Sequence, residues 1–187
     1  MKGTNTQTKN NRNPDYDELT AIFDQFAPAV YKYTMRLCHD PSVGDQIVGD
    51  SFAQLLEQYA SGKGRPTNLR SYLYQTAYRS IVLNLGNQRD QTLAEPRKAA
   101  PSAPWNDEQA KNEALVSALH NELTEEQGHL MILLFLEDLS LDDTASILDT
   151  PVDTIPAELR DIQRLIDKHP ELHMDVSLIL KKKRKSK

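Results

Sequence analysis

Residues 40–66 read DPSVGDQIVGDSFAQLLEQYASGKGRP and carry the clearest helix signal in the chain. The segment Asp40-Pro41 predicts the helix start, because proline suits a first helical position, and Ser42 with Asp45 predicts a capping box. The breaker cluster Ser61–Pro66 predicts the end. Apolar residues between these signals recur at three- and four-residue intervals, as one face of a helix requires. They are Val48, Phe52, Leu55, Leu56 and Tyr59.

Helical periodicity continues on both sides of this segment. Leu19, Ile22 and Phe23 begin an apolar stripe that predicts a helix from about Tyr16 to Cys38. A further stripe predicts a helix from about Asn68 to Asn87. No long stretch alternates with period two, so the first half of the chain predicts an all-α bundle.

The second half predicts helices beyond a proline-rich linker. Residues 91–112 contain three prolines and no apolar period, and prolines this close together interrupt a helix. Helices are then expected over Glu113–Leu123, from about Thr124, over Ser140–Leu148 and around Ile155–Ile166. The turn Asp149-Thr150-Pro151 between the last two predicts a helix-turn-helix.

These signals predict an all-α fold of two small helical domains joined by the linker. The expected parts are a disordered N-terminus at residues 1–14, a first domain at 15–90, the linker at 91–112, a helix-turn-helix domain at 113–170 and a basic tail at 171–187.

Composition narrows the function classes. The chain has one cysteine, Cys38, and no apolar run long enough to cross a membrane, so we expect a cytoplasmic protein without disulfides or zinc. Its five histidines are scattered, and no HExxH, Walker or glycine-rich phosphate loop is present. We therefore expect no enzyme activity, no metal site and no cofactor.

Charge is distributed unevenly along the chain. The formal net charge is -5 over 187 residues. Residues 113–170 contain only Arg160, Arg164 and Lys168 against thirteen carboxylates, whereas residues 171–187 contain six cations against two carboxylates. DNA phosphates attract Lys and Arg and repel carboxylates. The charge of the expected helix-turn-helix therefore disfavours DNA binding.

Several motifs of the chain, and the order in which they occur, resemble the extracytoplasmic-function class of bacterial sigma factors. The stretch Gly44–Phe52 is similar to the acidic, apolar-punctuated motif of sigma region two, and Leu69–Ala77 is similar to the helix that follows. Leu123–Gln127, Leu139–Ala145 and Leu148 are similar to sigma region four. The resemblance covers roughly residues 16–90 and 113–168.

The resemblance implies a transcription initiation factor with named contacts. Its partners would be core RNA polymerase, promoter DNA and an anti-sigma or other regulatory protein. Polymerase would bind Asp45, Gln46, Val48 and Asp50. The minus-ten element would be melted and held by Lys63, Arg65, Arg70, Tyr74, Tyr78, Arg79 and Arg89. Weak contacts of region four with DNA would come from Thr154, Arg160 and Arg164. On the alternative interpretation, the tyrosines are core residues and the cations form a solvated face.

The chain departs from the family in region four. Pro156 stands where the family usually has Lys, and Glu158 where it usually has Arg. Weak reading of the minus-thirty-five element is therefore expected, and a late start of the last helix at Pro156. The alternative is a sigma-like interaction module that a partner recruits to DNA or holds inactive, either an anti-sigma or an accessory targeting factor. A helical regulator unrelated to transcription is a third possibility.

Overall fold

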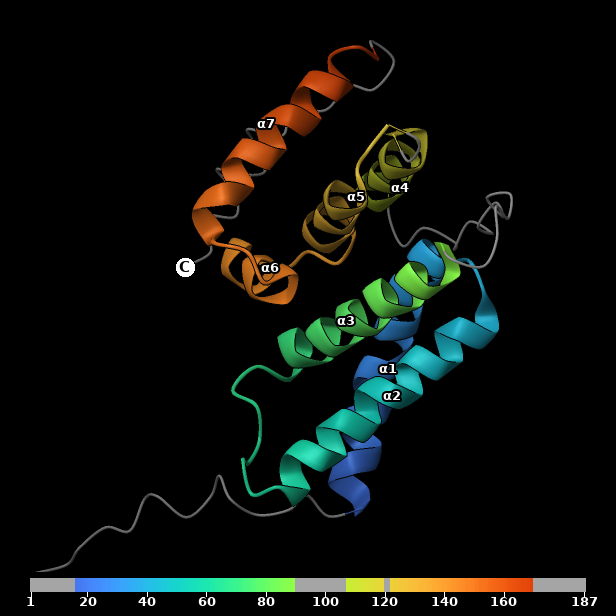
Figure 1. Cartoon of the computed structure of the whole chain (residues 1–187), viewed down its shortest axis with the longest axis vertical. Coiled ribbons are helices and arrows are strands. Elements are labelled where there is room, and N and C mark those ends of the chain that lie inside the picture. The colour runs from blue at the N-terminus through green and yellow to red at the C-terminus, as the bar shows by residue number, and fades with distance from the viewer. Residues whose placement is uncertain (1–15, 90–106, 120–121, 170–187) are drawn as a thin grey trace, which may run out of the picture. The chain divides into compact units, whose positions relative to one another are not determined.

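The computed structural model describes residues 16–89, 107–119 and 122–169 (Figure 1). All regular secondary structure in these ranges is helical, which confirms the predicted all-α class. The chain divides into two compact units, residues 1–99 (unit 1) and residues 100–187 (unit 2). The expected disordered N-terminus, the basic tail and most of the expected linker lie outside the described residues.

Unit 1 is a bundle of three helices, α1 (Tyr16–Cys38), α2 (Pro41–Ala60) and α3 (Leu69–Arg89), close to the predicted bounds. Each helix contacts the other two, and Figure 1 shows them packed side by side. The buried residues recur at helical spacing on each helix, as the apolar stripes predicted. The hydrophobic residues at most 1% exposed are Val30, Tyr33, Ile47, Leu55, Leu73, Tyr74, Ala77 and Ile81.

The turn between α1 and α2 is fixed by Asp40 and Gly44. Asp40 caps α2, since its Oδ1 accepts hydrogen bonds from the backbone N–H of Ser42 at 2.9 Å and of Val43 at 3.4 Å. The predicted cap at Ser42 is therefore wrong, because the residue before Pro41 is already extended and presents its carboxylate to the free amides. A Cβ on Gly44 would lie 3.0 Å from Tyr31 Cε2, so glycine lets the two helices approach closely.

Unit 2 contains the helices α4 (Asp107–Leu119), α5 (Glu125–Met131), α6 (Leu141–Leu148) and α7 (Ile155–Ile166). A π-helical turn, η1 (Ile132–Leu136), follows α5, and a 3-10 turn, η2 (Val152–Thr154), precedes α7. α4 begins at Asp107 rather than Glu113, so residues 107–112 are helical and do not belong to the predicted linker. The last linker proline is Pro104, and the residues after Asp107 favour a helix with an acidic first turn.

The helices α6 and α7 and the turn between them form where the capping residues predict. Ser140 Oγ accepts a hydrogen bond from Asp143 N–H at 3.0 Å and starts α6. Asp149 ends α6 in the left-handed conformation, with φ of 55°. Pro156 lies in the first turn of α7, where its missing N–H costs nothing, and α7 starts at Ile155 after the turn η2, as the position of this proline predicted. The shared core includes Leu115, Leu119, Leu130, Met131, Leu134, Phe135, Ala145, Ile155, Leu159, Ile162 and Ile166.

His129 on α5 is a buried ionisable residue in this unit. Its side chain is 0% exposed, and burial lowers its pKa from 6.5 to about 4. Between these values the unfolded chain binds a proton that the folded chain does not, so stability falls as the pH falls through that window.

We predict that replacing His129 reduces the acid sensitivity of unit 2. Between pH 7 and pH 4, wild type should lose about 3 kcal/mol more free energy of unfolding than His129→Gln, because glutamine does not titrate. Urea denaturation of both chains at a series of pH values measures this difference. Parallel pH profiles for the two chains would contradict the prediction.

Candidate protein- and nucleic-acid-binding surfaces

The predicted polymerase contacts lie on α2, but they do not share one surface. Asp45, Gln46 and Asp50 are exposed. Val48 is only 7% exposed, because it falls on the buried stripe of α2 together with Ile47. The structure therefore corrects the assignment of Val48, which is a core residue and offers little surface to a partner.

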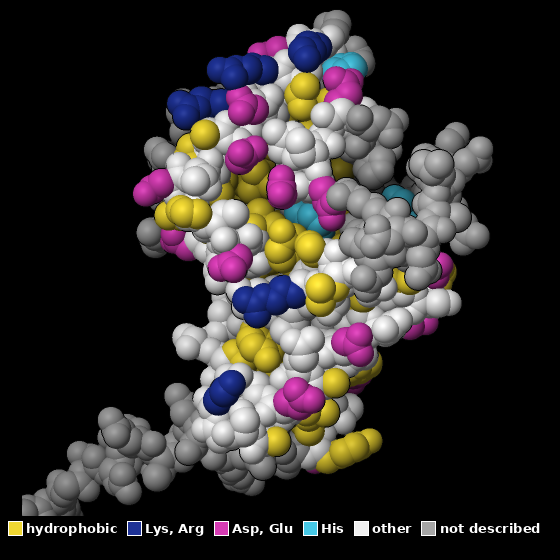
Figure 2. Space-filling view, viewed as in Figure 1, with side chains coloured by type: hydrophobic (Ala, Val, Ile, Leu, Met, Phe, Trp, Pro, Cys, Tyr) yellow, Lys and Arg dark blue, Asp and Glu magenta, His cyan; other side chains and the backbone are white. Residues whose placement is uncertain are grey.

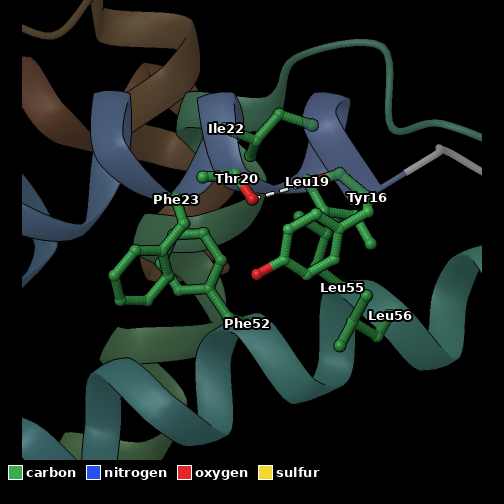
Figure 3. Close-up of a pocket in the computed structure, with 8 residues that line it drawn as sticks. All are labelled: Tyr16, Leu19, Thr20, Ile22, Phe23, Phe52, Leu55 and Leu56. Carbon is green, nitrogen blue, oxygen red and sulfur yellow. Dashed lines mark hydrogen bonds between the residues drawn. The ribbon is translucent and has the colours of Figure 1, made fainter.

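An apolar groove runs between α1 and α2 (Figure 3). Phe23 from α1 and Phe52 from α2 meet across it, with ring centroids 4.8 Å apart, and Tyr16 and Leu56 lie toward one end. The cavity volume is about 330 Å³. The groove is lined by Tyr16, Leu19, Thr20, Ile22, Phe23, Phe52, Leu55 and Leu56, and we call it the α1–α2 groove.

Exposure of the groove residues was not expected from the sequence. Tyr16 is 82% exposed, Phe23 47% and Leu56 46%, although the periodicity placed Phe23 and Leu56 on the inward stripes. The sequence did contain a signal for this exposure. The apolar face of each helix is wider than the core of a three-helix bundle can cover. Exposed apolar residues grouped in this way are typical of protein-binding surfaces.

The α1–α2 groove adjoins a second depression that has an acidic rim. Phe23 lines both depressions, and Asp24 and Asp45 line the second one beside Ala27, Pro28, Tyr31 and Val48. Apolar surface and exposed carboxylates therefore follow one another along the α1–α2 pair. This combination suits a protein partner that carries apolar and basic residues.

The loop after α2 carries two of the predicted DNA contacts. Gly62 and Gly64 have φ values of 74° and 73°, which glycine adopts without a steric penalty. Lys63 and Arg65 are exposed. Arg65 Nη1 lies 3.1 Å from Glu18 Oε1, so this guanidinium is paired with α1.

The aromatic DNA contacts predicted on α3 differ in exposure. Tyr74 is 0% exposed, and its ring packs against Tyr33 with centroids 5.2 Å apart, while the Arg70 guanidinium lies 5.7 Å from its centroid. Tyr74 is therefore a core residue, which corrects its assignment as a base-stacking ring. Tyr78 is half-buried and keeps part of its ring accessible.

The cations on α3 do not form one cluster. Arg70 and Arg79 are nine residues apart, which places them on opposite sides of a helix with 3.6 residues per turn. Arg79 lies near Tyr72 instead, since it lowers the pKa of that phenol, which burial raises. Arg89 is the last residue of α3.

The predicted region-four contacts lie among carboxylates. Thr154, Arg160 and Arg164 are all exposed. Thr154 Oγ1 donates a hydrogen bond to the Pro151 carbonyl at 2.7 Å, and Arg164 is paired with Asp161. Figure 2 shows Asp and Glu side chains spread over unit 2. The exposed carboxylates of α6, the turn and α7 are Asp142, Asp149, Asp153, Glu158, Asp161 and Asp167.

Comparison with known proteins does not assign a family. No protein-family model matches the chain, and no curated protein matches it significantly. Within residues 16–89, 107–119 and 122–169, no helix is long and apolar enough to cross a membrane. The same ranges contain no group of three or more His, Cys, Asp or Glu side chains placed to hold a metal ion.

We predict that Tyr74 and Tyr78 respond differently to truncation. Tyr74→Ala should lower the free energy of unfolding by about 3–5 kcal/mol, because it removes a fully buried aromatic ring. Tyr78→Ala is the matched control on the same helix and should cost clearly less. Urea denaturation followed by circular dichroism measures both values. Equal, small losses of unfolding free energy in the two variants would mean that Tyr74 is a surface residue, as the sequence predicted.

Proposed function

We propose that this chain is a sigma-like transcription initiation factor that binds core RNA polymerase through unit 1 and directs promoter opening. The observation that carries the proposal is the α1–α2 surface, where the exposed carboxylates of Asp24 and Asp45 line a depression next to the apolar groove of the three-helix bundle. The same α2 stretch carries the sequence resemblance to sigma region two. A cytoplasmic location goes with this function.

A protein fits the α1–α2 surface better than nucleic acid does. Asp24 and Asp45 on its rim repel phosphates, whereas they can pair with basic protein side chains. The exposed rings of Tyr16 and Phe23 supply apolar area that a protein partner can bury. Asp45, Gln46 and Asp50 remain the proposed polymerase contacts, and of these three Asp45 lies next to the groove.

The proposed DNA contacts are cations on the loop after α2 and on opposite sides of α3. Lys63, Arg65, Arg70 and Arg79 supply cations there, and Arg89 ends the helix. Tyr78 supplies the accessible ring, so capture of an unpaired minus-ten base rests on Tyr78 and these cations.

Unit 2 contributes little to DNA affinity in this proposal. Arg164 is already paired with Asp161, and Glu158 stands exposed on the same helix. Each phosphate contact adds affinity through release of a counterion, so a face with few available cations gains little. Weak reading of the minus-thirty-five element follows, with Thr154 and Arg160 as its remaining polar contacts.

The acidic surface of α6 and α7 favours a second candidate function. On this alternative the chain is a sigma-like interaction module, recruited to DNA or held inactive by a partner protein such as an anti-sigma or an accessory targeting factor. Promoter-opening assays with core polymerase separate the two functions, because only an initiation factor supports open-complex formation without the additional partner.

We predict that charge reversal on α2 weakens polymerase binding. The double variant Asp45→Lys, Asp50→Lys should reduce affinity for core RNA polymerase by about tenfold or more, because it turns attraction for basic partner residues into repulsion. The matched control is Glu126→Lys with Asp153→Lys, which makes the same change of charge at exposed positions of unit 2. Co-purification and titration with core polymerase measure the effect. Equal binding by the α2 variant and wild type would remove the assignment.

A further inference from the structure

The loop after α2 holds Arg65 against α1 by its backbone geometry. Ser61 ends α2, and the left-handed residues Gly62 and Gly64 then turn the chain back toward α1. Arg65 Nη1 reaches Glu18 Oε1 at 3.1 Å, across 47 positions of sequence. The two side chains are 51% and 43% exposed, so the pair is open to solvent and to ligands.

Tyr59, in the last turn of α2, lies close to the Arg65–Glu18 pair. Tyr59 is 5% exposed, and its hydroxyl makes no hydrogen bond within the described part of the chain. Burial raises the pKa of Tyr59, Arg65 lowers it and Glu18 raises it, so both charged groups lie near this phenol. The pair is therefore a tertiary contact that joins α1, α2 and the loop.

We propose that Glu18 competes with nucleic-acid phosphate for Arg65 and so limits the affinity of the loop for single-stranded DNA. A carboxylate and a phosphate accept hydrogen bonds from the same guanidinium donors, and the donor atom Nη1 is engaged by Glu18. Lys63, two residues earlier, is exposed on the same loop, so phosphate that reaches the loop meets Lys63 and competes with Glu18 for the Arg65 donor Nη1. The inference rests on the proposed function, since it takes the loop as a DNA contact.

The gain in DNA affinity expected from the release of Arg65 is modest. Exposed ion pairs contribute modestly to stability, so release of Arg65 should raise affinity by about twofold to fivefold. One additional phosphate contact should also steepen the dependence of log K on log salt by about 0.7 for single-stranded DNA. The change in salt slope distinguishes a new contact from a general change of charge.

Binding of a labelled single-stranded oligonucleotide to the full chain, followed by fluorescence anisotropy at several salt concentrations, tests the proposal. Glu18→Gln should show the gain in affinity and the steeper salt slope. Glu57→Gln removes another exposed carboxylate of unit 1 and should show a smaller gain without the added slope. The gain from Glu18→Gln should disappear in an Arg65→Gln background.

Two results would overturn the competition. Equal gains from Glu18→Gln and Glu57→Gln would mean that only net charge matters. Absence of binding by every chain at low salt would mean that the loop does not hold phosphate at all. In that case the titrations with core polymerase still measure the proposed function separately, because they depend on Asp45 and Asp50 rather than on Arg65.

Discussion

The close packing of α1 against α2 is the constraint on which the rest of unit 1 depends. Gly44 permits it, because any larger residue would bring its Cβ against Tyr31 and Met35, at 3.0 and 3.1 Å. Asp40 fixes the start of α2, so the register of the two helices is set on both sides of the turn. With that register, Ile47 and Leu55 face the core with α3, while Phe52 meets Phe23 on the outside.

The same packing produces two surfaces of opposite character. On the outer face of the α1–α2 pair, apolar side chains remain exposed beside Asp24 and Asp45. The packing of the three helices does not by itself require this combination. At the end of α2 the chain turns through Gly62 and Gly64 and presents Lys63 and Arg65. Glu18 belongs to α1 near Tyr16 and Leu19, so its pair with Arg65 connects the groove to the cationic loop. The proposed protein-binding face and the proposed phosphate-binding loop are thus joined through one contact.

The sequence predicted what local signals determine. The bounds of α1 and α2 and the cap at Ser140 follow from periodicity and capping residues within a few positions. It could not separate covered apolar residues from exposed ones, since Val48, Tyr74 and Phe23 have similar spacing but different neighbours in space. It also could not pair Arg65 with Glu18, because only the folded loop brings the two together. Most of the candidate site therefore required the tertiary arrangement.

The central claim is that the α1–α2 groove is the face that meets polymerase. Hydroxyl-radical footprinting of the full chain, with and without core RNA polymerase, tests it most directly, because Tyr16, Phe23 and Leu56 are exposed and reactive in the free chain. Val152 is 38% exposed in unit 2 and serves as the internal reference. The account predicts protection of the three groove residues and little change at Val152. Protection of Val152 with unchanged reactivity at Tyr16, Phe23 and Leu56 would contradict it.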